Sequence, residues 1–558
     1  MRWWWLAGAL LLAGCRTSAS QPTVFAAIGD WEMPPAYHGN YFAPWGNMQD
    51  GAYVYEPLFI YLPRRGRYIG RLATGYQESP DHLTLTVHVK PHVLWQDGSR
   101  FTSQDVACTT WVAWATGQDL HSVSSIECPD DETIVYHFWQ PSPATVVRTL
   151  TRWIAAPRSR FGKWGAQASA LFAKHLGPVE LSHAMHDLRE DLFQYHPAVP
   201  IGTGPYMVKR VTASDLELDR FLQYHDADRV HVDQVRLIRS RDNAVAWSLL
   251  MAGELDVCAP ATPLEVAQEI LHENPQSHLL TVSDMSDFGV LFNCQRGPTA
   301  DVRVRQGLAA FIDRDQVRKL AYPYGTTAHD DSVGAPSTFR DAWVGDTTGW
   351  PQYAFDLAKG ASLLESAGWR RGDDGRWRDS SGSVVRLEMA APGGSTDMVT
   401  LAEVVATQLA RAGLACEVRA LDPAYYQSSL LGHNFQLASV TGVALAGVAK
   451  PSVAYDRLVS GEIGSEADVG LDRHLAERLD ALPDGPEQHE VVRQLARAVD
   501  DACFYIPCYE KNLMIFTVDG RRITGWPSDT DEIWQAAPGG IDMLYATLLA
   551  NGTLRPAR

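Results

Sequence analysis

Several short segments combine residue types that occur in catalytic or metal-binding sites, but none completes such a site. HEVVR, from His489, lacks the second histidine of the zinc motif H-E-x-x-H. GTGPYM, from Gly202, lacks the third glycine of a dinucleotide-binding loop. Cys503 and Cys508 are spaced too widely for a C-x-x-C metal or redox pair. DDGRWRD, from Asp373, lacks the ligand spacing of an EF-hand and is typical of a hairpin turn. We therefore expect no catalytic residue, no metal ion and no cofactor, and we expect a protein that is not an enzyme.

Composition and charge narrow the class of protein. The chain has 558 residues, of which 46% are hydrophobic and 20% are charged, as in a soluble globular protein. Single cores stop growing at roughly 250–300 residues, so the length predicts two or three lobes. The formal net charge is −18. Because nucleic-acid binding needs a basic surface, this charge argues against DNA or RNA as a partner.

The N-terminal sequence MRWWWLAGALLLAGC predicts export from the cytoplasm. Arg2 supplies a positive start, and residues 3–13 form an apolar run too short for a stable membrane anchor. We interpret residues 1–14 as a signal peptide. The ending LAGC resembles the lipobox of bacterial lipoproteins, which implies that Cys15 becomes the first mature residue and carries lipid, including palmitate. Residues 15–24 would be the lipidated cysteine and a tether, and the body would lie on the extracytoplasmic face of the cell membrane.

An odd number of cysteines remains once Cys15 is set aside. An oxidising compartment permits disulfides, but one thiol must stay free or pair outside the chain. We favour a Cys108–Cys128 disulfide, because a helix followed by a returning strand would bring the two close. Buried free thiols are the alternative.

Hydrophobic periodicity predicts a mixed α/β chain. Strands are expected where LTLTVHV (83–89) and TIVYHFW (133–139) alternate, and helices where AFDLAKGASLLESAGW and TLAEVVATQLARAG repeat at helical spacing. Between the two strands, Thr102 and Asp105 have the spacing of a capping box at a helix start. We find no internal repeat and no Pro/Ser-rich linker, so the lobes must share elements.

A series of motifs, in order along the chain, resembles one protein family. The segments are LWQDGSRFTSQDV, IGTGPYMVKR, LFNCQRGPTADVRVRQGLAAFIDRDQV, LLESAGWRRGDDGRW and LARAGLACEVRALDPAYY. They are similar to signatures of the bacterial extracytoplasmic solute-binding proteins of family 5, the peptide/nickel class that serves ABC importers. The likeness runs from about residue 25 to residue 549.

The resemblance implies a fold and a function. The fold is α/β, a two-lobed periplasmic-binding-protein fold (type II, large) with an extra subdomain in the first lobe. We expect the lobe I core at 25–50, 193–290 and 509–558, the extra subdomain at 51–192, and lobe II at 291–508. GVLFNCQ and FYIPCYE would cross between lobes. The protein would be a monomer that captures an oligopeptide by hinge closure and delivers it to the ABC importer permease.

One departure from the family leaves the ligand open. Peptide binders of this family often carry an acid in the second lobe for the peptide ammonium, but residues 435–455 contain none. A buried ammonium without a partner is costly, so another acid serves, with Asp422 and Asp456 first, or the ligand is neutral. The 18 tryptophans and 20 tyrosines keep an oligosaccharide, held by stacking on aromatic faces, as the alternative ligand.

Candidate ligand-binding residues follow from position in the family pattern. The N-terminal segment that approaches the cleft in this family contains Tyr41, Trp45 and Asn47. We add Thr441 from the second lobe and Trp526 from the returning C-terminal segment.

Overall fold

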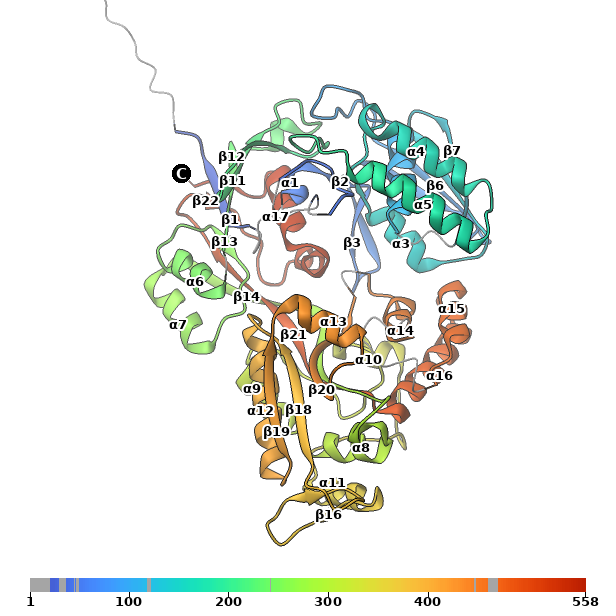
Figure 1. Cartoon of the computed structure of the whole chain (residues 1–558). Coiled ribbons are helices and arrows are strands. Elements are labelled where there is room, and N and C mark those ends of the chain that lie inside the picture. The colour runs from blue at the N-terminus through green and yellow to red at the C-terminus, as the bar shows by residue number, and fades with distance from the viewer. Residues whose placement is uncertain are drawn as a thin grey trace, which may run out of the picture.

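The computed structural model describes residues 21–29, 37–44, 46, 50–117, 122–240, 242–445, 448–459 and 470–557. Figure 1 shows two lobes, one above the other, with a further subdomain beside the upper lobe. Within the described residues, an 11-stranded mixed sheet runs through both lobes in the order β10-β11-β12-β1-β13-β21-β14-β20-β18-β19, with β15 paired to β21. The description of an α/β chain is therefore correct.

Two long antiparallel strands connect the lobes. β14 (Ser277–Phe292) and β21 (Tyr505–Val518) pair along nearly their whole length. One end of the pair contacts β13 of lobe I and the other contacts β20 of lobe II. The register breaks between Ser283 and Asp287, where Met285 takes a left-handed φ of 52°. A bulge of this kind bends the strands at the point where they pass from one lobe to the other.

Lobe I is built from pieces far apart in the sequence. Its parallel strand β1 lies between β12 and β13, and helix α17 near the C-terminus packs against β1 through Phe25 and Tyr545. The elements are β1 (Val24–Ile28), α1 (Gly51–Val54), β10 (Tyr206–Val211), β11 (Asp215–Arg220), η1 (Ala227–Arg229), β12 (Gln234–Ile238), α6 (Asn243–Met251), β13 (Val257–Cys258), α7 (Leu264–Glu273), β22 (Ile523–Thr524), η4 (Glu532–Gly539), α17 (Ile541–Ala550) and β23 (Arg555–Pro556).

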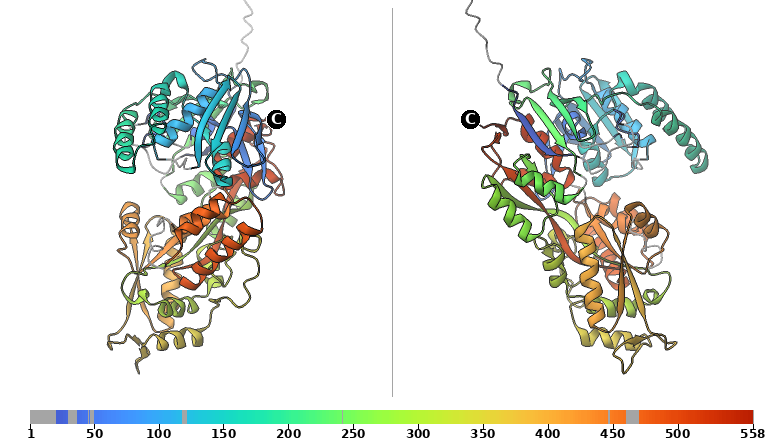
Figure 2. Two further views of the ribbon diagram at one scale, coloured as in Figure 1. Left: turned by 90° about the vertical axis from the view of Figure 1, so that its right-hand side faces the viewer. Right: turned by 60° about the vertical axis from the view of Figure 1, so that its left-hand side comes forward.

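The extra subdomain packs a four-stranded antiparallel sheet, β5-β6-β8-β7, against helices. Figure 2 shows this sheet and its helices on one side of lobe I. The elements are β2 (Glu56–Pro57), β3 (Phe59–Leu62), β4 (Arg67–Gly70), β5 (Ala73–Glu78), β6 (Thr84–Val89), α2 (Ser103–Ala115), β7 (Val123–Asp130), β8 (Thr133–Phe138), α3 (Pro143–Thr151), β9 (Trp153–Ile154), α4 (Arg158–Phe172) and α5 (Pro178–Phe193). Its core is continuous with that of lobe I, since Trp95 and Phe25 belong to one buried cluster.

Lobe II carries the remaining strands and most of the helices. Its elements are η2 (Pro298–Ala300), α8 (Val302–Ala310), α9 (Arg314–Ala321), β15 (Thr326–Thr327), α10 (Ser337–Trp343), α11 (Leu357–Ser366), β16 (Arg370–Arg371), β17 (Trp377–Arg378), β18 (Arg386–Pro392), α12 (Thr396–Arg411), β19 (Ala415–Leu421), α13 (Pro423–Leu431), β20 (Leu437–Ala444), α14 (Pro451–Val459), α15 (Arg473–Ala481) and α16 (Pro486–Ala502). Two buried clusters fill it, and one of them continues into α6 and α7 of lobe I. The lobe boundaries given above stay predictions.

The predicted capping box forms. The Asp105 carboxylate accepts the Thr102 backbone N–H at 2.8 Å, and its other oxygen accepts the Arg158 N–H at 2.7 Å. Asp105 therefore fixes the start of α2 and joins it to the start of α4. Together with the fully buried Trp95, this contact explains why the strand–turn–helix unit is so strongly specified: it holds the extra subdomain together.

The predicted disulfide is wrong. Cys108 and Cys128 are both free thiols, as are the other cysteines that the structure describes. Gly165 of α4 lies directly over the Cys108 Sγ, so the thiol occupies the space between two packed helices. Burial raises the pKa of Cys108 to about 12. Such a thiol packs as a small apolar group. Among the described residues, no helix is long and apolar enough to cross a membrane.

Candidate functional site

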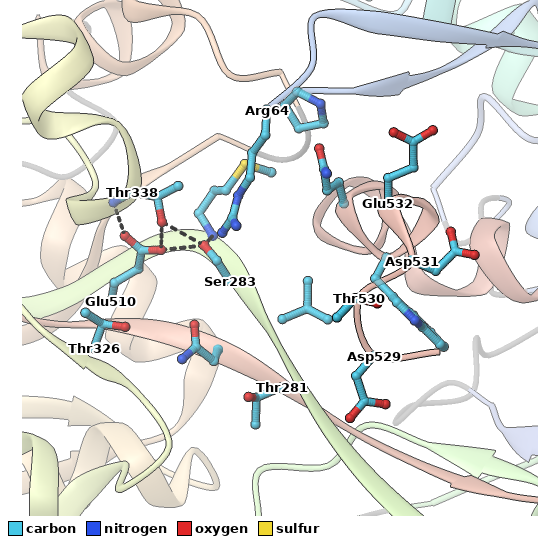
Figure 3. Close-up of a pocket in the computed structure, with 16 residues that line it drawn as sticks. Arg64, Thr281, Ser283, Thr326, Thr338, Glu510, Asp529, Thr530, Asp531 and Glu532 are labelled. Atoms are coloured by element: carbon cyan, nitrogen blue, oxygen red, sulfur yellow. Dashed lines mark hydrogen bonds between the residues drawn. The ribbon is translucent and has the colours of Figure 1, made fainter. Parts of the chain in front are cut away.

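The space between the lobes contains two neighbouring cavities, which together form the cleft. The first, the inner compartment, has a volume of about 370 Å³ and lies against the crossing strands. Its lining comes from both crossing strands, from the segment 529–535 and from lobe II, and it includes Arg64, Ser283, Glu510, Asp531, Thr326 and Thr338. Figure 3 shows Arg64 reaching into this compartment from the extra subdomain. The second, the outer compartment, has a volume of about 620 Å³ and lies between the extra subdomain and lobe II.

Glu510 is the buried acid of the inner compartment. Its side chain is on β21, and the residue is only 1% exposed. The carboxylate accepts the hydroxyls of Ser283 and Thr338, and it also accepts the Thr338 backbone N–H at 2.7 Å (Figure 3). Ser283 belongs to β14 and Thr338 to α10. Glu510 therefore connects both crossing strands to a helix of lobe II at the bend.

Two further acids lie beside Glu510 on β14. Asp287 is directly opposite Glu510 in the strand register, and its carboxylate accepts the Val443 backbone N–H. Burial raises the pKa of Asp287 to about 7, and the neighbouring Glu510 charge adds to the rise. Burial also raises the pKa of Asp284 to about 6, although Lys511 opposes the shift. Three acids therefore meet at the bend, where like charges directly opposite one another destabilise a strand pair.

The lobe I wall of the inner compartment is also acidic. Asp529 forms an ion pair with His278 at 2.8 Å, and Glu532 pairs with Arg67. Within the described part of the chain, neither Asp531 nor Glu510 forms an ion pair, and Arg64 is the cation that lines the compartment. The inner compartment therefore suits a ligand that brings a positive charge.

Aromatic rings form both walls of the outer compartment. On the subdomain side, Tyr61 and Tyr68 are cross-strand neighbours in the β3–β4 hairpin with ring centroids 4.8 Å apart, and Tyr76 lies 5.3 Å from Tyr68. On the lobe II side, Phe339 and Trp343 stack at 5.1 Å on successive turns of α10. These rings are only partly buried, and Tyr76 is 40% exposed. Exposed rings on facing walls are typical of a ligand pocket rather than of a core.

The tip of the β3–β4 hairpin joins the two compartments. Pro63 at this tip lines both cavities, and the neighbours Thr338 and Phe339 face one cavity each. Figure 1 shows β3 pointing from the upper lobe towards the lower one. One extended ligand therefore has a continuous path from the bend to the rim of the cleft.

A direct hydrogen bond joins the extra subdomain to lobe II at the rim of the cleft. Ser142, which caps α3 of the extra subdomain, donates its hydroxyl to the Asp480 carboxylate on α15 of lobe II at 2.6 Å. Ser142 is 2% exposed and also accepts the Thr145 N–H. This contact, the latch, joins the lobes at the end of the cleft opposite the crossing strands.

The structure places the sequence-predicted residues away from these compartments where it describes them. Tyr41 packs against Tyr55 and Trp153, and burial raises its pKa. Thr441 lies within β20, opposite Phe288 of β14. Trp526 contacts Phe25 and Tyr545, and its indole N–H donates to the Val518 carbonyl at 3.1 Å.

None of Tyr41, Thr441 and Trp526 lines either described compartment. Trp45, Asn47 and Cys15 lie outside the described residues. All six stay predictions. Asp422, suggested as a substitute acid, caps α13 by accepting the Ala424 N–H at 3.0 Å.

The comparisons with known proteins identify the family. The model named "Bacterial extracellular solute-binding proteins, family 5 Middle" matches residues 67–463. The chain belongs to this family. Its relatives include a Brucella ovis protein named as an ABC transporter peptide-binding protein, 28% identical over 359 residues, which are 60% of this chain. The match spans 59% of the Brucella protein.

Solved structures of family 5 proteins share the fold. A Thermotoga maritima periplasmic oligopeptide-binding protein with bound mannohexaose has a TM-score of 0.71 at 19% identity, covering 94% of this chain and 98% of its own. The Bacillus subtilis oligopeptide-binding protein AppA, in complex with a nonapeptide, has a TM-score of 0.69 at 16% identity, covering 96% and 100%. The predicted two-lobed periplasmic-binding-protein fold is confirmed.

Sequence reasoning missed the residues that line the cleft. Glu510 ends FYIPCYE, which we expected to cross between lobes, and an acid at the end of an apolar crossing strand was a usable signal. The aromatic walls gave no comparable signal, because Tyr76 and Trp343 are far apart in sequence and each resembles an ordinary core residue.

Proposed function

We propose that this family 5 protein is the solute-binding component of an ABC importer. It takes an oligopeptide into the cleft, closes its lobes around it and presents it to the permease as a monomer. The observation that supports this proposal best is the cleft itself, which both lobes line and which the bent pair β14 and β21 connects. Closure about a few bent strand residues is the hinge motion of periplasmic binding proteins.

The acids of the inner compartment support a peptide with a free amino terminus. Residues 435–455 contain no acid for an ammonium, but Glu510 and Asp531 face the inner compartment and form no ion pair among the described residues. A buried ammonium requires such a partner. The name of the Brucella relative and the nonapeptide in the Bacillus structure agree with a peptide ligand.

We also propose that the protein is a lipoprotein. LAGC places Cys15 directly after the apolar run, where a lipid would hold the protein at the extracytoplasmic face of the cell membrane.

An oligosaccharide is the second candidate ligand. The rings of the outer compartment offer stacking surfaces, and the Thermotoga structure holds mannohexaose. Sugar rings stack on such faces without needing an acid.

Mass spectrometry of the small molecules released on denaturation tests the choice of ligand. We expect peptides with free amino termini. Recovery of sugar alone would replace the peptide proposal with the second candidate.

A binding measurement tests the role of the acids. We expect an N-acetylated peptide to bind at least about tenfold more weakly than the same peptide with a free amine, and Asp531→Asn to reduce that difference. Glu477→Gln on α15, an exposed acid outside both compartments, is the matched control. Equal affinity for the two peptides would contradict recognition of the ammonium.

A further inference from the structure

The two aromatic walls of the outer compartment are arranged to hold a flat apolar group between them, and we call these walls the clamp. One wall, with Tyr61, Tyr68 and Tyr76, belongs to the extra subdomain, and the other, with Phe339 and Trp343, belongs to α10 of lobe II. An aromatic ring that entered between them would contact rings on two separate lobes. Aromatic pairs at centroid distances of 4.5–7 Å attract one another beyond the area they bury.

Several polar groups around the clamp are paired with one another. His82 contacts Glu78 at 2.7 Å, Lys450 contacts Asp484 at 3.2 Å, and Gln488 donates to Asp484 at 3.3 Å. Sugar hydroxyls need many free donors and acceptors close to the stacking rings. A side chain of a peptide needs none. These three contacts occupy donors and acceptors that a sugar would use, which favours an apolar occupant beside them.

Proline and aliphatic residues complete the lining. Pro141, Pro143, Val146 and Val147 come from the start of α3, and Pro451 and Pro483 come from lobe II. Residues that are rigid or β-branched lose little side-chain entropy when a ligand binds. These residues and the rings give the space rigid apolar surfaces, and it opens towards the acidic inner compartment at Pro63.

Hydrogen bonds connect the clamp to the bend in the crossing strands. Thr338 donates both its hydroxyl and its N–H to Glu510, and the next residue, Phe339, is part of the clamp wall. Glu510 therefore positions α10, and with it both lobe II rings, relative to the crossing strands. A ligand ring held between the lobes would stabilise the same closed arrangement.

We propose that the outer compartment is a specificity subsite for an aromatic side chain of the bound peptide, gripped between Tyr76 and Trp343. This inference rests on the proposed function and adds the class of peptide selected. Peptides with a phenylalanine or tryptophan that reaches the subsite bind more tightly than peptides with small polar residues there.

The test uses pentaalanine and two series derived from it, with phenylalanine or serine at each of the five positions, and mannohexaose as a further probe. Affinities are measured by calorimetry on the full-length protein freed of ligand. We expect at least one phenylalanine peptide to bind about tenfold more tightly than its serine counterpart. Tyr76→Leu and Trp343→Leu each bring the affinities of the phenylalanine and serine peptides close together, so that the preference is lost.

Trp350→Leu is the matched control, because Trp350 is a half-buried tryptophan of lobe II that stacks on Arg493 outside the cleft compartments. Trp350→Leu should keep the preference for the phenylalanine peptides over the serine peptides. Equal affinities for the phenylalanine and serine series, or a preference that survives both clamp variants, would overturn the subsite and leave the peptide importer standing. Binding of mannohexaose without any peptide binding would overturn both proposals.

Discussion

Removal of the latch should shift the protein towards its open form. Asp480→Ala deletes the acceptor of the 2.6 Å hydrogen bond from Ser142, which joins the rims of the two lobes. A hydrogen bond to a charged group contributes about 1.5–3 kcal/mol. Asp480 is half-exposed, so solvent screening lowers this value. Ser142 keeps its cap contact with the Thr145 N–H and donates to the Thr145 hydroxyl at 2.8 Å, so no buried group loses its last partner.

The net effect is then about 1–2 kcal/mol, which lowers the ratio of closed to open protein about 5–30-fold. Because the ligand binds the closed arrangement, the apparent affinity falls by the same factor wherever the closed form is no longer dominant. Small-angle scattering of the ligand-free protein should give a larger radius of gyration for the variant. Saturating ligand should return it to the wild-type value.

The control is Glu477→Ala, which removes one exposed acid from the same helix α15. It should change neither the radius of gyration nor the affinity. The melting temperature of Asp480→Ala should stay close to that of the wild type, since α3 and α15, which the bond joins, are each packed into a different buried cluster. If Asp480→Ala and Glu477→Ala are indistinguishable in scattering and in affinity, the latch does not stabilise closure and the reasoning is wrong.

Three more predictions concern anchoring, packing and pH. Cys15→Ala should move the protein from the membrane fraction to the soluble fraction, because the lipid contributes about 0.8 kcal/mol per buried CH₂; unchanged fractionation would contradict the lipoprotein proposal. Trp526→Ala should lower the free energy of unfolding by about 3 kcal/mol in urea denaturation, because the ring packs on Phe25; weaker binding by the folded fraction would instead support its predicted ligand contact. Burial raises the pKa of Asp287 to about 7, so the folded chain holds this proton to a higher pH than the unfolded chain does. This group therefore makes stability fall as pH rises from about 4 to 7, and Asp287→Asn should flatten the fall in that range; an equal slope in the variant would exclude Asp287 as its source.

Local signals in the sequence predicted local structure well. The Thr102–Asp105 capping box starts α2, and Gly368 takes a positive φ of 90° just after α11, as a C-terminal glycine stop requires. The Asp-Gly turn near Asp373 is the β16–β17 hairpin. Each feature depends on residues a few positions apart, so propensity and turn chemistry decide it.

Features that depend on residues far apart in the sequence could not be predicted from local patterns. Of β14 only GVLFN was predicted, because the polar run around Asp284 and Asp287 interrupts the strand pattern that the pairing with β21 sustains. The cleft is assembled from the β3–β4 hairpin, α10 and the crossing strands, which no local pattern brings together. The order of the motifs along the chain identified the family and the fold. The residues that line the cleft could be identified only from the structure.

The position of β1 sets the order in which this chain can fold. A ribosome makes Phe25 long before Tyr545, yet their rings are in contact in the finished lobe I. β13, which pairs with β1, also pairs with β21, a strand that is made much later. Lobe II strands β18, β19 and β20, by contrast, come from one continuous stretch and pair with each other as soon as it is complete. The first-made lobe is thus completed last, and a chain cut before β21 would leave β13 without its neighbour at the centre of the sheet.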